Sequence, residues 1–135
     1  MNRCLSIFMV VGVVVGGITV YASRSQSQTP AAAALMERKL ESAKSVLEGV
    51  VTANYDLLSR EAQRLRLLSQ ETDWNVLQTD DYIRFSHDFR NATDQLRRAA
   101  EAKNLDAATV GYIKLTMTCV DCHQHVRGVR AGGRR

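Results

Sequence analysis

The sequence predicts an all-α fold, an antiparallel up-and-down four-helix bundle. Apolar residues recur at three- and four-residue steps in four separate segments. The only proline, Pro30, precedes all four, so no helix interior is interrupted. Residues 31–127 show no alternation of apolar and polar residues typical of a half-buried strand. With mostly short connections between the segments, neighbouring helices are expected to pack antiparallel.

Residues 1–22 are predicted to be a signal peptide. Arg3 supplies a positive charge, residues 5–20 are apolar or small, and Val20-Tyr21-Ala22 resembles a cleavage site. The apolar run of about 16 residues is short of the ~20 that span a bilayer. A retained N-terminal anchor, holding the chain to the membrane through residues 5–20, is the alternative. In both cases the folded part is exported, which indicates a periplasmic location, and the polar residues 23–30 form a linker.

The predicted bundle occupies residues 31–127. The first helix, 31–53, has an apolar stripe made of Leu35, Met36, Leu40, Ala43, Val46, Leu47, Val50 and Val51. The second, 55–69, has an inward face made of Leu57, Leu58, Ala62, Leu65 and Leu68. Residues 71–78 form the longest break, and its tryptophan, Trp74, is expected to plug one end of the bundle.

The third helix, 79–103, begins with Thr79 as its N-cap and has two aspartates in its first turn. Its apolar stripe repeats near the heptad period. The fourth helix begins near Asp106 and is expected to stop at Gly128. Residues 128–135, rich in glycine and arginine, are predicted to be a basic flexible tail.

The fourth helix contains the run Cys119-Val120-Asp121-Cys122-His123. This Cys-x-x-Cys-His pattern is the attachment signature of a c-type haem, in which two thiols bond to the porphyrin and the following histidine binds the iron. At about 100° per residue, Cys119, Cys122 and His123 share one helix face. The sequence therefore predicts one covalent haem c, with His123 as the proximal ligand.

A zinc site or a redox dithiol is the alternative for this pair of cysteines. A closed zinc site needs about four protein ligands, and outside the motif the chain offers only Cys4, in the predicted leader, His87 and His125. A thioredoxin-like dithiol is typical of a strand–helix setting, which the sequence does not indicate. Haem attachment is therefore the favoured interpretation.

The exported bundle with this motif on its last helix resembles the cytochrome c-prime and cytochrome c556 family. Val126 and Arg127 follow the motif where that family has an aromatic or apolar residue and an arginine. Ala34-Leu35-Met36 is similar to an apolar-apolar-Met run on the family's first helix. The family usually has an arginine four residues before this Met, where the present chain has Ala32.

The resemblance implies that Met36 is the sixth iron ligand, as in low-spin members of the family. Leu40, one turn further on, is expected to pack on the haem ring, and Lys39 lies near the same face. Arg127 is expected to pair with a haem propionate, because arginine suits carboxylate contacts. His125 is expected to point away from the haem, and His87 lies off the apolar stripe of its helix.

The charge distribution argues against nucleic acid as a partner. The net charge of +4 comes from six arginines at the chain ends, and without them 12 basic residues face 14 acidic ones. No basic stripe with interleaved aromatic residues is present. The expected partner is a redox protein, and a homodimer is left open.

The function expected from these features is electron transfer by a Met/His-ligated haem, whose filled axial positions suit that role. The alternative is a high-spin, c-prime-like protein that binds nitric oxide or carbon monoxide under an apolar lid. An enzyme is not expected, because a peroxidase needs a distal acid–base group and residues 35–40 offer no histidine.

Overall fold

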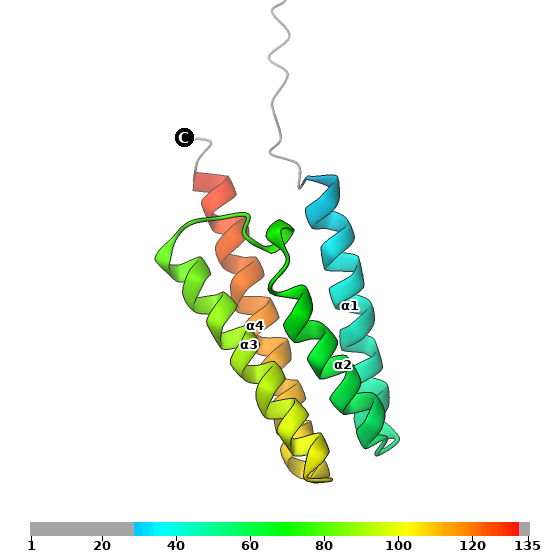
Figure 1. Ribbon diagram of the computed structural model, residues 1–135. Helices are drawn as coiled ribbons and strands as arrows, with labels where there is room; N and C mark the ends of the chain where they lie inside the picture. Colours follow the sequence, from blue (N-terminus) through cyan, green and yellow to red (C-terminus); the bar gives the residue numbers. More distant parts are fainter. Residues whose placement is uncertain (1–28, 133–135) are drawn as a thin grey trace, which may run out of the picture.

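The computed structural model describes residues 29–132, and all of their regular structure is helical (Figure 1). The elements are α1 (Pro30–Val51), α2 (Tyr55–Leu68), the short 3-10 helix η1 (Thr72–Trp74), α3 (Asp80–Glu101) and α4 (Leu105–Gly132). No strand occurs within the described range. The prediction of an all-α fold with four helices is confirmed.

Side-chain caps set where the helices begin. Thr29 Oγ1 accepts a hydrogen bond from the backbone N–H of Ala32 at 3.2 Å, and Pro30 occupies the first turn, where its missing N–H has no consequence. The end of the predicted linker therefore belongs to the start of α1. Thr79 caps α3 as predicted, accepting from the N–H of Tyr82 at 3.2 Å.

The two tight connections of the bundle share one construction. Each contains a residue with φ of 51°, Ala53 before α2 and Lys103 before α4. An asparagine follows in both places, and its Oδ1 accepts a hydrogen bond from the helix, at 3.0 Å for Asn54 and 2.9 Å for Asn104. A left-handed residue ends one helix while the asparagine begins the next.

The last helix is longer than the sequence predicts. Gly128 was expected to end it, but α4 continues through Gly128 to Gly132. Nothing lies within 4 Å of where a Cβ of Gly128 would stand, so this glycine takes part in the helix as an ordinary exposed position. The predicted flexible tail, 128–135, is therefore wrong for residues 128–132, and residues 133–135 lie outside the described range.

The buried face of α1 is rotated from the predicted one. Leu35 and Val46 are fully buried as expected, but Leu40 is 59% exposed, and Leu47 and Val51 are also exposed. The buried positions between them are taken by polar residues instead, because the helix faces the core with Lys39 and Ser42. Leu40, which was expected to pack on the haem ring, therefore faces solvent in the structure.

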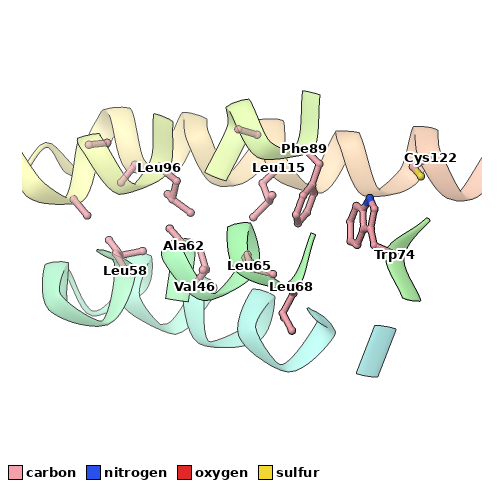
Figure 2. Packing of buried hydrophobic residues seen from close by; sticks show 14 of the residues in the cluster. Val46, Leu58, Ala62, Leu65, Leu68, Trp74, Phe89, Leu96, Leu115 and Cys122 are labelled. Atoms are coloured by element: carbon pink, nitrogen blue, oxygen red, sulfur yellow. The ribbon is translucent and has the colours of Figure 1, made fainter. Parts of the chain in front are cut away.

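The core is a continuous row of apolar side chains between the helices (Figure 2). Leu65 and Leu115 lie in its middle, Leu58 and Leu96 toward one end, and Trp74 and Cys122 toward the other. Trp74 is 2% exposed, so the expectation that it plugs one end of the bundle is confirmed.

Helices that follow one another in the chain make most of the packing. Figure 1 shows α1 and α2 joined at one end of the molecule, α2 and α3 at the other, and α3 and α4 at the first end again. The contact between α3 and α4 is the most extensive, whereas α1 and α4 touch each other only sparsely. Gly111 of α4 comes close to Leu96 of α3, where an added Cβ would stand 3.4 Å from the Leu96 Cα.

The predicted signal peptide (1–22) and most of the linker (23–30) lie outside the described residues, as does the proposed anchor at 5–20. Within residues 29–132, none of the helices has the length and apolar character needed to cross a bilayer.

Candidate functional site

A cavity of about 190 Å³ is lined by residues from the start of α1 and the end of α4. Figure 1 shows that these two helix ends lie at the same end of the bundle. Three elements enclose the cavity together with the connection between α2 and α3. Its walls are made by Ala32, Met36, Lys39, Trp74, Val76, Tyr82, Cys122, His123, Val126, Arg127 and Arg130. The cavity therefore brings the Cys-x-x-Cys-His motif of α4 against the Met36 turn of α1.

The α4 wall presents the motif in the order that helix geometry predicts. Cys122 is buried and Cys119 is half-buried one turn earlier, while His123 lines the cavity as an exposed residue. Both cysteines are free thiols. Arg127 and Arg130 follow on the same side of the helix, toward its end. The thiols and the imidazole thus share one face, as expected.

The α1 wall is formed by Ala32, Met36 and Lys39, at helical steps of four and three residues. Met36 is partly buried and packs against the core cluster. Leu40 does not line the cavity. Of the two α1 residues assigned to the haem site from the sequence, the structure brings Met36 to the motif and turns Leu40 away from it.

Lys39 is the charged residue buried in this wall, with 6% of its surface exposed. Its Nζ lies 4.4 Å from the centre of the Trp74 ring and 4.2 Å from the centre of the Phe89 ring. These two rings contact each other at 5.1 Å between centroids. A lysine ammonium at such distances is attracted by the negative faces of aromatic rings.

Trp74 is held in the cavity wall by two hydrogen bonds. Its Nε1–H donates to Ser86 Oγ at 2.9 Å, and its backbone carbonyl accepts from the Tyr82 hydroxyl. Burial, more than the nearby Cys122, raises the pKa of Tyr82 to about 12. The Tyr82 hydroxyl therefore stays protonated and acts as a donor over the physiological range.

The electrostatics of the site reflect burial and the positive charges of Lys39 and Arg127. Burial lowers the pKa of Lys39, and the neighbouring Cys119 and Cys122 oppose that shift. Burial also raises the pKa of the Cys122 thiol. Partial burial, followed by the charges of Lys39 and Arg127, lowers the pKa of His123. The neutral imidazole, which is the form that binds iron, is thereby favoured.

The two other histidines of the described chain lie outside the cavity. His125 faces α3, where its Nε2 is 3.1 Å from Thr79 Oγ1 and its ring lies 5.5 Å from that of Phe85. His87 is exposed on α3 and contacts Asn91. Both positions agree with the expectation that neither histidine belongs to the site.

Comparison of the chain with protein-family models, curated proteins and solved structures found no match. Within residues 29–132, no three His, Cys, Asp or Glu side chains come together as a metal-binding group. The interpretation of the site therefore rests on its own geometry.

Several residues of the cavity were missed by sequence reasoning. Trp74 and Tyr82 were assigned to packing alone, and Ala32 and Arg130 were given no role. Arg130 lies three residues after Arg127, which is the spacing of two residues on one helix face. Because the helix was expected to end at Gly128, the sequence did not predict that the two arginines share a face. The sequence signal for the burial of Lys39 is that it lies four residues after Leu35 and three before Ser42, which are both buried.

The cavity brings together a buried thiol and an imidazole from α4 and a thioether from α1 in a mostly apolar wall. Two arginines at the helix end are placed for carboxylates, since guanidinium groups bind carboxylates in paired hydrogen bonds.

Proposed function

We propose that this protein is an exported c-type cytochrome that binds one haem covalently through Cys119 and Cys122 and transfers electrons. The observation that carries the proposal is the shared cavity: His123 and Met36, far apart in the sequence, line the same space beside Cys122. His/Met is the ligand pair of electron-carrying c-type haems, which it holds at raised potential.

The residue types that line the cavity suit a haem. Its apolar wall, with Trp74, Val76 and Val126, suits a porphyrin face, and Arg127 and Arg130 suit its propionates. A volume of about 190 Å³ is below the ~300–1,000 Å³ of most cofactor and ligand sites. Haem binding therefore requires the α1 side of the wall to move outward, and the sparse contact between α1 and α4 permits this.

Each residue has one task in the proposed site. The thiols of Cys119 and Cys122 fix the group to α4, and neutral His123 donates a nitrogen lone pair to the iron. Met36 supplies a soft sulfur ligand from α1. The haem supplies a reversible one-electron couple, and a carrier with filled axial positions needs no substrate pocket.

The gas-binding alternative is less well supported. It requires an apolar lid over an open iron, and Met36 and Leu40 were the two residues expected to form it. Leu40 is 59% exposed and outside the cavity, and the buried charge of Lys39 takes that part of the wall. Of the two residues expected to form the lid, only Met36 lines the cavity.

The same proposal includes a topology, a family and a location. An antiparallel up-and-down bundle with haem on α4 is supported by the alternating ends of the connections in Figure 1. That arrangement and the motif support membership of the cytochrome c-prime and c556 family. The predicted leader supports a periplasmic site of action, with a redox protein as partner.

The attachment is tested by denaturing the purified protein in acidified acetone. Covalent haem stays with the protein pellet, whereas haem released into the solvent contradicts the proposal. A Cys119→Ser/Cys122→Ser variant is the control, and we expect it to retain no haem in the pellet.

The sixth ligand is tested by the far-red absorption band that marks a Met–iron bond in the oxidised protein. We expect the band in the wild type, its loss in Met36→Ala and its retention in Leu40→Ala, because Leu40 faces solvent. A wild type that lacks the band and binds carbon monoxide readily would overturn the electron-carrier assignment in favour of gas binding.

A further inference from the structure

Lys39 occupies a position that lysine rarely takes. It is 6% exposed and faces the cavity, and it forms no ion pair with any carboxylate of residues 29–132. Its Nζ contacts only the faces of Trp74 and Phe89 among the interactions found there. Lysine is almost never buried without a partner, because removing an ammonium group from water is costly.

The aromatic contacts do not fully replace a partner for this nitrogen. Cation–π attraction at a desolvated site is weaker than the free energy lost on removing an ammonium ion from water. A group that binds in the cavity and accepts the nitrogen lone pair or the charge would satisfy Lys39. Arg127 and Arg130, at the end of α4, already suit the acidic edge of a haem.

We propose that Lys39 is the reserve sixth ligand of the haem iron, binding through its amine whenever Met36 is absent from the iron. This inference rests on the proposed function and deepens it. Lys39 and Met36 lie three residues apart on the same wall of α1, and both line the cavity that His123 also lines. The four-carbon stem of lysine gives its nitrogen a long reach from the helix.

The coordination step balances in charge and atoms. The Nζ lone pair forms the bond to iron, and the proton lost from the ammonium group passes to solvent. No electron is transferred in this step, so no oxidant or reductant is required. The result is a six-coordinate haem that a small gas molecule can enter only by displacing the amine.

The test uses the full-length, haem-loaded Met36→Ala protein beside Met36→Ala/Lys39→Arg. Arginine keeps the positive charge but does not give up its proton to become a ligand. We expect low-spin, six-coordinate haem in the single variant and high-spin, five-coordinate haem in the double variant, by electron paramagnetic resonance and absorption. Lys39→Arg with Met36 present is the matched control for folding and haem attachment.

Carbon monoxide binding gives a second measure. If Lys39 holds the iron in about nine-tenths of the Met36→Ala molecules, their apparent affinity for carbon monoxide is about tenfold weaker than that of the double variant. Equal affinities would overturn the proposal. So would a single variant that is already high-spin, or a double variant that remains low-spin.

A third measurement needs only the single variant and covers the case in which the double variant does not mature. In Met36→Ala grown with isotopically labelled lysine side-chain nitrogen, pulsed electron paramagnetic resonance should detect the label bound to iron. Absence of that coupling overturns the lysine assignment alone. A protein that attaches no haem at all would instead overturn the proposed function and this assignment with it.

Discussion

At the scale of single residues, the two histidines of the motif region face different neighbours. His123 lines the cavity, whereas His125, two residues later, contacts Thr79 and Phe85 of α3. Two residues on a helix are about 200° apart, so one histidine cannot replace the other without rewinding α4. This makes His125 a matched control for His123.

We expect His123→Ala to lose the native haem spectrum or to fail in haem attachment, because its imidazole is the proposed proximal ligand. His125→Ala should keep the spectrum and lose only about 1 kcal/mol of stability, the worth of one hydrogen bond. Absorption spectra of the reduced proteins and urea unfolding measure both effects. An unchanged spectrum in His123→Ala would assign the ligand role to another residue.

The residues of the site differ in how well the sequence alone predicts their positions. Cys119, Cys122 and His123 were identified because their spacing is a chemical requirement for haem attachment. Lys39 was expected near the haem face, but its burial in the α1 wall was not predicted, because a helical period fixes spacing but not rotation. Leu40 and Leu47 are more apolar than Lys39 and Ser42. The predicted buried face of α1 therefore included two leucines that the structure exposes to solvent. Only the contacts with α2 and the Trp74 turn decide that rotation.

At the scale of elements, two helical glycines differ in how closely other residues pack around them. An added Cβ at Gly128 meets nothing within 4 Å, whereas at Gly49 it would stand 2.8 Å from Leu58 Cγ and 3.3 Å from the Asn54 carbonyl oxygen. Both residues are inside helices. The same substitution therefore has opposite consequences at these two sites.

We expect Gly128→Ala to stabilise α4 by up to about 1 kcal/mol, the difference in helix propensity. Gly49→Ala should destabilise the protein by about 1–3 kcal/mol, because the overpacked Cβ forces α1 and α2 apart. Chemical denaturation of the two variants beside the wild type measures the effect. Destabilisation by Gly128→Ala would show that α4 does not extend to Gly132.

The helices themselves were predictable because propensity, period and caps agree along most of the chain. Thr79 began α3 as expected, and the boundaries of α2 and α3 fall within two residues of the predicted ones. The end of α4 was missed because glycine is read as a stop, although an exposed glycine is tolerated inside a helix at modest cost. Nothing in the local sequence distinguishes these two uses.

At the scale of the whole molecule, one exposed ion pair joins α1 to the connection after α2. Arg38 binds Glu71 with both guanidinium nitrogens, one of them at 2.9 Å. That hydrogen bond, more than the charge alone, lowers the pKa of Glu71. A carboxyl with a lowered folded-state pKa stabilises the fold above its unfolded pKa and loses that contribution as the pH falls through the folded value.

We therefore expect the wild type to be more stable than Glu71→Gln at neutral pH. In urea unfolding, the difference should shrink as the pH falls below the ordinary glutamate pKa of about 4.3 and vanish once it is below the lowered folded-state pKa of Glu71. The neutral-pH difference should shrink in high salt, because both side chains are exposed. Glu37→Gln, an exposed glutamate of α1 without an ion pair in the described chain, is the control. A difference that persists in acid contradicts the role of this pair.

The sparse contact between α1 and α4 has a consequence for how the molecule comes apart. With most packing between helices adjacent in the chain, residues 29–132 form a row of helices rather than a closed ring. Rows of this kind lose their terminal members first and unfold with reduced cooperativity. A group bonded to α4 and held by α1 would join the two ends of that row, so that all four helices melt as a single unit.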